Sequence, residues 1–343
     1  MGLLMDYEFI VKNSKGEIYN IYLNENKQIE YIVANTMNQW EKKHTIFHEA
    51  IYSFSVDIDK FNQIHIISLS TKGVLRYHSF KSNQWIHQEL ADCSKYSSEI
   101  YYPSIKILHN KVHIFYYFHY KKHANICSLI HLVKTEEGWS KKSLIDITFR
   151  EIINPFHLML HDKKMHILFG SLDGKCTQIY LTSYDTSLGQ WNHPLKITES
   201  TIDKVYLSGI IDERNTLHIA WSDYDEKGLA VQYTSYNFNR NKEDTLILSL
   251  SEKSNASFPL LLFYKNILWC TWTQMNKLYS CYSKDRGKSW SLPLLSKESQ
   301  GIHYKRYRYI SSGQDEQQGI LCDFLYGTLY PKIQFIGFGG EII

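Results

Sequence analysis

The segment Thr216-Leu217-His218-Ile219-Ala220 has a pattern from which the architecture of this chain can be predicted: a histidine or aromatic residue centred in a short apolar run. The run recurs along the whole sequence at intervals of about 50 residues, a period typical of repeat architectures. The clearest copies lie at residues 63–67, 111–115, 164–168 and 267–271, and weaker ones lie at 17–21 and 318–322. The chain therefore contains about seven repeated units.

Each unit has room for four short strands. Between the central run and a later tryptophan lies a second strand-like run, as at residues 74–79 and 231–235, and a third run, often with proline, precedes the centre, as at 102–107 and 258–262. The tryptophans of this second marker are Trp40, Trp85, Trp139, Trp191 and Trp290. Four strands separated by polar turns are typical of one propeller blade.

We therefore predict an all-β chain that folds as one β-propeller of about seven four-stranded antiparallel blades, with six blades as the alternative. Consecutive apolar residues indicate strands covered on both faces, as in stacked blades, rather than helices or a one-sided sheet. An open solenoid is the other architecture considered, but a closed ring leaves no large exposed edge. The expected blades of this single domain are 1–47, 48–95, 96–147, 148–200, 201–250, 251–299 and 300–343.

Composition limits the function without naming it. The 343 residues carry 38 Lys+Arg against 35 Asp+Glu, a net charge of +3, so we expect neither nucleic acid nor an anionic membrane as an obligatory partner. The first eleven residues include Asp6 and Glu8 and no long apolar run, and no stretch is long enough to span a bilayer. We expect a cytoplasmic protein whose six single cysteines are reduced; three disulfides in an oxidising compartment are the alternative.

One short motif points to a family. Ser283-Lys284-Asp285-Arg286-Gly287-Lys288-Ser289-Trp290 matches the pattern S-x-D-x-G-x-x-W in full and falls between the expected third and fourth strands of its unit. Ser283 and Asp285 can accept backbone hydrogen bonds, Gly287 allows positive φ, and Trp290 can pack between sheets. Degenerate copies occur at 183–191 and 235–239. We expect these residues to have structural roles.

On these residues the chain resembles the sialidase-like, Asp-box (BNR-repeat) β-propellers. The resemblance implies turn structure and not catalysis, because in that family the box lies away from the active site. Family sialidases also use an arginine triad, and this chain has no Arg-Ile-Pro segment near its start; its first arginine is Arg76. Nothing in the spacing of Arg150, Arg214, Arg306 and Arg308 indicates such a triad. We do not expect sialidase activity.

The histidines His65, His113, His166 and His218 occupy the same position in successive units. We expect them to make repeated core hydrogen bonds, because equivalent positions on neighbouring blades are too far apart to share one metal. We predict no metal site and no cofactor.

Propellers normally bind ligands through the loops that join each blade to the next and the second strand to the third. In those loops the chain places aromatic residues beside charged ones, which suits sugar rings and acidic saccharides. The candidate ligand-binding residues are Tyr101, Tyr102, His119, His123, Arg150, Asp223, Asp225, Arg306 and Arg308.

Three functional hypotheses follow. The first is a non-catalytic, sialidase-like propeller that binds a glycan, a glycoconjugate or a protein partner at the channel mouth. The second is a carbohydrate-active enzyme, a glycosidase or polysaccharide lyase, that uses Asp223 with Asp225, or His119 with His123. The third is a structural interaction scaffold. The sequence leaves the ligand, the catalytic residues and the oligomeric state open.

Overall fold

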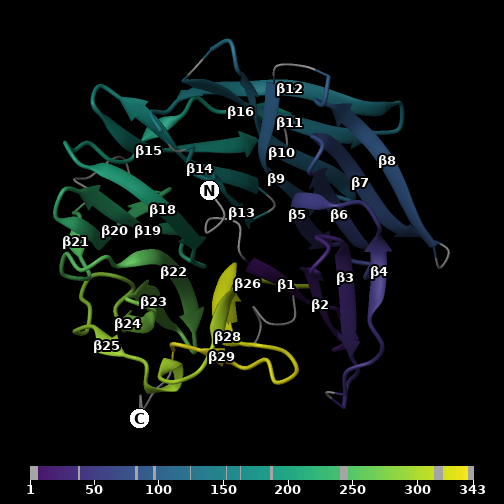
Figure 1. Cartoon of the computed structure of the whole chain (residues 1–343). Coiled ribbons are helices and arrows are strands. Elements are labelled where there is room, and N and C mark those ends of the chain that lie inside the picture. The colour runs from purple at the N-terminus through teal and green to yellow at the C-terminus, as the bar shows by residue number, and fades with distance from the viewer. Residues whose placement is uncertain are drawn as a thin grey trace. The chain divides into compact units, whose positions relative to one another are not determined.

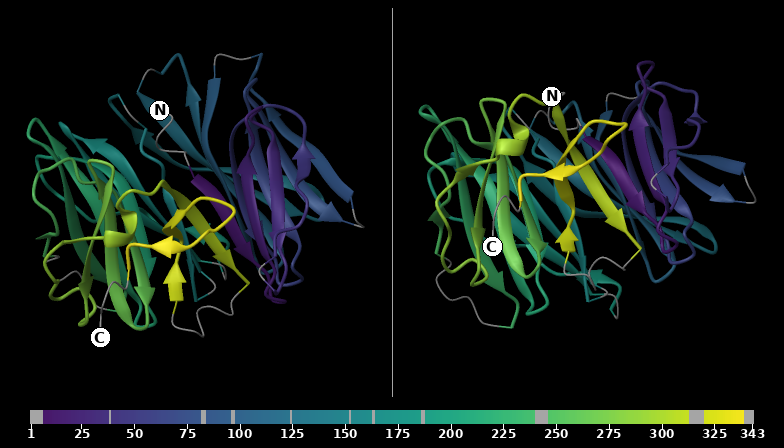
Figure 2. Two further views of the ribbon diagram at one scale, coloured as in Figure 1. Left: turned by 60° about the horizontal axis from the view of Figure 1, so that its bottom comes forward. Right: turned by 90° about the horizontal axis from the view of Figure 1, so that it is seen from below.

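The computed structural model describes residues 7–37, 39–81, 84–95, 98–123, 125–151, 153–162, 164–185, 188–239, 246–312 and 320–338. The regular structure of these residues is β-strand, apart from one 3-10 helix at Lys297–Ser299 (Figure 2), so the prediction of an all-β chain is confirmed. No helix in this part of the chain has the length and apolar character needed to cross a membrane. The chain divides into two compact units. Unit 1 comprises residues 1–150 and 308–314, and unit 2 comprises 151–307 and 315–343.

Unit 1 contains three successive antiparallel meanders of four strands, each strand pairing with the next in the chain (Figure 1). The first is β1 (Tyr7–Lys12), β2 (Ile18–Leu23), β3 (Ile29–Ala34) and β4 (His44–Phe47). The second is β5 (Ile51–Ile58), β6 (Ile64–Ser70), β7 (Val74–Lys81) and β8 (Gln84–Asp92). The third is β9 (Ser98–Leu108), β10 (Lys111–Tyr120), β11 (Ile126–Thr135) and β12 (Gly138–Thr148).

Unit 2 continues the same pattern with shorter outer strands. Its first sheet is β13 (His157–His161), β14 (Lys164–Asp173), β15 (Cys176–Asp185), β16 (Gln190–Trp191) and β17 (Leu195–Lys196). The second is β18 (Asp203–Ile211), β19 (Thr216–Asp225), β20 (Gly228–Asn237) and β21 (Leu248–Ser249). The third is β22 (Ser257–Tyr264), β23 (Ile267–Gln274), β24 (Lys277–Ser283) and β25 (Leu294–Leu295), with β27 (Ile320–Cys322) added beside β22.

The chain returns to its beginning through β26 (Tyr304–Ser311), which pairs with β1. Within unit 1, the Ser312 N–H donates to the Lys12 carbonyl at 3.1 Å, and Ile310 packs in the cluster that contains Phe9. In unit 2, β28 (Phe324–Thr328) pairs with β29 (Phe335–Ile336). Because β26 and these two strands are counted with β1 to β4, the described strands form six sheets rather than seven. The blade count therefore remains a prediction.

The turn from the first strand to the second is stabilised in the same way in several sheets. A side-chain oxygen of Asn13, Asp59 or Asp212 accepts the backbone N–H groups two and four residues later, at 2.8 to 3.0 Å. Short polar side chains favour such turns because they replace missing backbone partners. These residues thus fix where the first strand of each sheet ends.

Apolar cores lie between successive sheets inside each unit. In unit 1 one core joins β1–β4 to β5–β8, with Phe9 and Phe54 rings 4.9 Å apart, and another joins β5–β8 to β9–β12. In unit 2 comparable cores contain Trp221 and Trp272. Strands buried on both faces explain the consecutive apolar residues seen in the sequence.

The four repeated histidines lie in these cores. The Nδ1 atom of each histidine forms a hydrogen bond with a side chain on the third strand of its own sheet. The pairs are His65 with Tyr77 (2.6 Å), His113 with His131 (3.0 Å), His166 with Ser183 (2.7 Å) and His218 with Tyr233 (2.6 Å). Burial lowers the pKa of His113 and of His166 to about 4. The expected core hydrogen bonds are thus present, and they lie within sheets rather than between them.

Candidate functional site

The first strands of three sheets carry an aromatic residue in a left-handed backbone conformation near their start. The φ angles are +54° at Tyr102 in β9, +60° at Tyr206 in β18 and +53° at Phe258 in β22. Each residue lies at a register shift between the first and second strands of its sheet. Positive φ costs a bulky residue about 1–3 kcal/mol and is concentrated at functional sites. We call this end of each sheet, where its first strand begins, the entry end.

In unit 2, Tyr206 and Phe258 form one surface with Arg306. Their two rings lie 4.1 Å apart at 32°, and the Arg306 guanidinium lies 4.7 Å from the centre of the Phe258 ring. The hydroxyl of Tyr326 donates to the Phe258 carbonyl at 2.8 Å, which helps to hold the strained backbone. We call Tyr206, Phe258 and Arg306 the aromatic–arginine shelf.

Electrostatics keep the shelf cationic. Burial raises the pKa of the Tyr206 hydroxyl, and the positive charge of Arg306 opposes that effect only in part. Tyr206 is therefore a neutral hydroxyl at neutral pH, while Arg306 is charged. A cation on an aromatic face beside a hydroxyl donor suits a ligand that carries both a carboxylate and an apolar ring face.

Asp223 lies in β19, opposite Lys204 of β18, close along the strand to Tyr206. It accepts the Trp221 indole N–H at 2.7 Å, and burial raises the pKa of its carboxyl group. The Lys204 side chain is buried, and its ammonium donates to Ser200 Oγ at 2.7 Å and to the Ile202 carbonyl at 2.8 Å. A buried Lys204 and a partly buried Asp223 thus lie on paired strands close to Tyr206.

Asp225, two residues after Asp223, has a partner of its own. Its carboxylate forms an ion pair with Lys253 on the surface, and the hydrogen bond from Lys253 lowers its pKa. Asp223 and Asp225 were predicted to act as a pair, but Asp223 accepts the Trp221 indole N–H whereas Asp225 is paired with Lys253, so the two carboxylates have different partners.

Unit 1 gathers four of the predicted residues at its own entry end. Tyr101 donates its hydroxyl to Glu99, which also forms an ion pair with Lys121 at 2.9 Å. The His119 ring lies 6.3 Å from the Tyr101 ring, and its Nε2 contacts the His123 carbonyl at 3.2 Å. Tyr102 is buried beside Tyr101, at 6.3 Å between ring centres. The structure therefore brings Tyr101, Tyr102, His119 and His123 together.

The other two predicted arginines, Arg150 and Arg308, lie in different surroundings. Arg150 follows Phe149, whose ring lies 5.5 Å from that of His119, so it belongs to the edge of the same cluster. Arg308 lies in β26 and is only 7% exposed, so it offers little surface to a ligand.

Two residues of the shelf, Tyr206 and Phe258, were not among the candidates predicted from the sequence. The signal for Phe258 was available in the Phe258-Pro259 pair, because the same aromatic-proline order occurs at Tyr102-Pro103.

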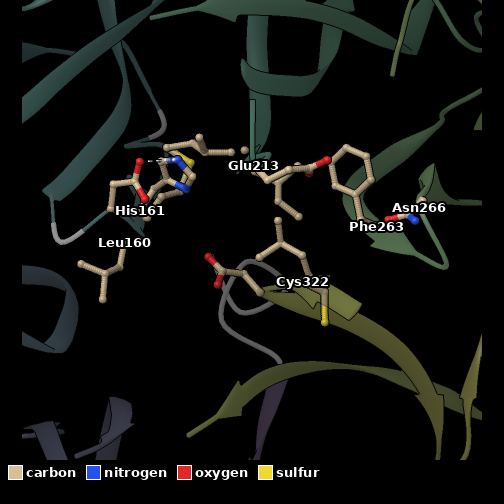
Figure 3. Close-up of a pocket in the computed structure, with 13 residues that line it drawn as sticks. Leu160, His161, Glu213, Phe263, Asn266 and Cys322 are labelled. Carbon is tan, nitrogen blue, oxygen red and sulfur yellow. Dashed lines mark ion pairs between the residues drawn. The ribbon is translucent and has the colours of Figure 1, made fainter. Parts of the chain in front are cut away.

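A cavity of about 700 Å³ opens in unit 2 at the opposite end of the first strands of the sheets, where these strands finish (Figure 3). We call this the exit end. Its lining includes the ends of β13, β18 and β22 and the turns that follow them, as well as β27. Figure 3 shows Leu160 and His161 on one side and Phe263 and Asn266 on the other. Gly209 is required here, because a Cβ would approach Leu168 to 2.5 Å and Met159 to 2.9 Å. The sequence analysis did not predict this cavity.

The Asp-box turn lies next to that exit end. Gly287 N–H donates to Ser283 Oγ at 2.7 Å, Ser289 N–H donates to Asp285 Oδ1 at 2.9 Å, and the Trp290 ring packs edge-on against Tyr233 at 4.8 Å. Arg286 of the box binds Asp212 at 2.8 Å and also contacts Glu213, which lines the cavity. The box thereby connects two sheets of unit 2.

Among the described residues, no group of three or more His, Cys, Asp or Glu side chains is placed to hold a metal ion. None of the six cysteines forms a disulfide, and four of them are buried.

No protein-family model and no curated protein sequence matches this chain, so the Asp-box relationship remains a prediction. Its fold is similar to those of solved carbohydrate-active β-propellers. A polysaccharide lyase, PL25 ulvan lyase bound to -[GlcA(1-4)Rha3S]-, has a TM-score of 0.67 at 11% identity, over 98% of this chain and 92% of that one. Polysaccharide lyase Uly1 gives 0.65 at 11%, over 98% and 91%. Penicillium chrysogenum α-L-arabinanase with arabinobiose gives 0.52 at 8%, over 80% and 92%. At these identities the likeness shows the fold alone.

Proposed function

We propose that this chain is a carbohydrate-active propeller that binds a uronate-containing polysaccharide at the aromatic–arginine shelf and cleaves it by elimination. The observation that carries the proposal is the Arg306 guanidinium placed over Phe258, beside a second aromatic ring held in a strained backbone. Strain kept at equivalent positions of several sheets indicates that the direction of these side chains matters.

Binding would use two complementary contacts. A guanidinium matches a carboxylate in geometry and charge, so Arg306 would pair with the uronate group. The rings of Tyr206 and Phe258 would pack against the apolar face of a sugar ring. The shelf therefore favours acidic over neutral saccharides.

Elimination at a uronate breaks the C5–H and C4–O4 bonds, forms a C4=C5 double bond and moves one proton from C5 to the leaving oxygen. No water, oxidant or reductant is consumed. Arg306 would stabilise the negative charge that develops on the carboxylate. Tyr206, which burial keeps protonated, would donate its proton to the leaving oxygen while the same phenolic oxygen takes the proton from C5, so that both transfers occur in one step. We propose elimination rather than hydrolysis because the shelf provides a cation for a uronate carboxylate, and two of the propellers with a similar fold are polysaccharide lyases.

The test is incubation with a panel of uronate polymers, including ulvan, alginate and pectate, while the absorbance of the unsaturated product is followed. We expect activity on at least one polymer, and a loss of about 100-fold or more in Arg306→Ala and in Tyr206→Phe. Tyr206→Phe should keep most of the affinity, since the ring remains. Arg214→Ala, which removes an exposed arginine from the same unit, should behave like the native chain. Full activity in Arg306→Ala contradicts the proposal.

Non-catalytic recognition of a glycan or glycoconjugate is the second candidate function. It is favoured by the hydrogen bonds that already occupy Asp223 and Lys204, two titratable groups on the strands beside Tyr206. Polymer binding that depends on Arg306, without any unsaturated or hydrolysed product, supports this function instead of cleavage.

We further propose that the seven repeats close as seven blades, with β26 and the following strands joined to β1–β4 in the last and first blades. The hydrogen bond between Ser312 and Lys12 supports a return of the chain to its start. A crystal structure tests the count directly, and an open or six-bladed arrangement would overturn it.

A further inference from the structure

The exit-end cavity of unit 2 is chemically unlike the shelf. Both lie on the same strands, since β18 carries Tyr206 near its start and Gly209 to Ile211 at its end. A volume of about 700 Å³ is in the range of pockets that hold small ligands, and it can accommodate a short oligosaccharide. Nothing in the proposed elimination uses this space.

The lining of the cavity is acidic. Asp162, Glu213 and Asp323 contribute carboxylates, and among the described residues no lysine or arginine lines it. Arg286, which does not line the cavity, is shared between Glu213 and the buried Asp212. Asp162 is 72% exposed, and its carboxylate lies 3.5 Å from His161 Nε2. The cavity therefore disfavours a uronate and attracts a cation.

Acidity alone would not distinguish a ligand site from a solvated surface, but the cavity also has an apolar floor. Met159, Phe263 and Leu321 contribute to it, while His161 and Asn266 stand on opposite sides (Figure 3). Apolar area with a few polar groups around it is the usual composition of a small-molecule site. Polar groups on several sides suit a ligand with many hydroxyl groups better than a compact inorganic ion.

We infer that this cavity binds a saccharide that carries ammonium groups, such as a glucosamine oligomer. The carboxylates of Asp162 and Glu213 accept hydrogen bonds from the ammonium and hydroxyl groups, and the apolar floor packs against a ring face. The inference does not depend on the function proposed for the shelf.

Calorimetric titration with a glucosamine trisaccharide tests the inference, with its N-acetylated counterpart as the matched ligand without charge. The glucosamine trisaccharide should bind at least about tenfold more tightly, because charge-assisted hydrogen bonds are about twice as strong as neutral ones. Its affinity should fall as salt is added. The double variant Asp162→Asn, Glu213→Gln should weaken binding by about tenfold or more.

Glu199→Gln is the matched control, because Glu199 is an 87% exposed carboxylate of the same unit that does not line the cavity. Its affinity and that of Arg306→Ala should equal that of the native chain. Thermal unfolding of each variant checks that the fold is retained. Equal binding of the two trisaccharides, or unchanged affinity in the folded double variant, overturns the inference. Loss of binding in Arg306→Ala would place the saccharide at the shelf and overturn the inference as well.

Discussion

At the scale of single residues, backbone conformation explains why particular side chains occupy particular places. Tyr102, Tyr206 and Phe258 accept an unfavourable φ at equivalent positions. Gly287 shows the opposite case, since it has a φ of +86° and a Cβ there would lie 1.8 Å from the Tyr233 hydroxyl. The Asp-box glycine is thus required for conformation and for space.

Gly287→Ala should lower the free energy of unfolding by about 2–4 kcal/mol, the sum of positive φ and a steric clash. Gly174→Ala is the matched control, because Gly174 has a φ of +65° and nothing within 4 Å of its Cβ position. It should cost only about 1–2 kcal/mol. Urea denaturation of both variants measures the difference, and equal losses would show that the contact with Tyr233 is unimportant.

At the scale of elements, the last residues of β26 pair with β1, although they come from the opposite end of the sequence. Ile310 is 6% exposed and packs with residues of β1 and β5 in unit 1, although more than half of the chain separates them. Such a contact closes a long loop, and its loss should affect the whole of unit 1.

Ile310→Ala should destabilise the fold by about 2–5 kcal/mol, the usual cost of truncating a buried isoleucine. Ile86→Ala in β8, where the side chain is 50% exposed, should change stability by less than about 1 kcal/mol. Denaturation monitored by tryptophan fluorescence compares them. A small effect of Ile310→Ala would mean that β26 contributes little to unit 1.

At the scale of the whole molecule, buried histidines tie stability to pH. Burial lowers the pKa of His113 to about 4 and those of His78 and His131 to about 3. In the unfolded chain these groups titrate near about 6.5, so the folded state binds fewer protons below that value. Their contribution to stability is present in full above about pH 6.5 and is lost as the pH falls toward their folded pKa values.

We expect the free energy of unfolding to drop between about pH 7.5 and 5.5 by on the order of 1 kcal/mol for each such histidine. His131→Phe, which keeps a ring but cannot titrate, should reduce this drop whatever its effect at neutral pH. His193→Gln, which removes an exposed histidine, should leave it unchanged. Urea denaturation at the two pH values gives the comparison, and an equally steep drop in His131→Phe contradicts the assignment.

The sequence by itself determined the all-β class, the repeat and the positions of the core histidines, because these depend on local apolar patterns that recur at a regular interval. It also named Arg306, Tyr101 and His119 as candidates, but it assigned them to loops, whereas the structure has them in strands. Only the tertiary structure placed Tyr206 against Phe258 and separated Asp223 from Asp225. It alone revealed the exit-end cavity. Those features depend on the distances between strands that are about 50 residues apart in the sequence, and on backbone bulges. A regular spacing of strand-like runs predicts neither.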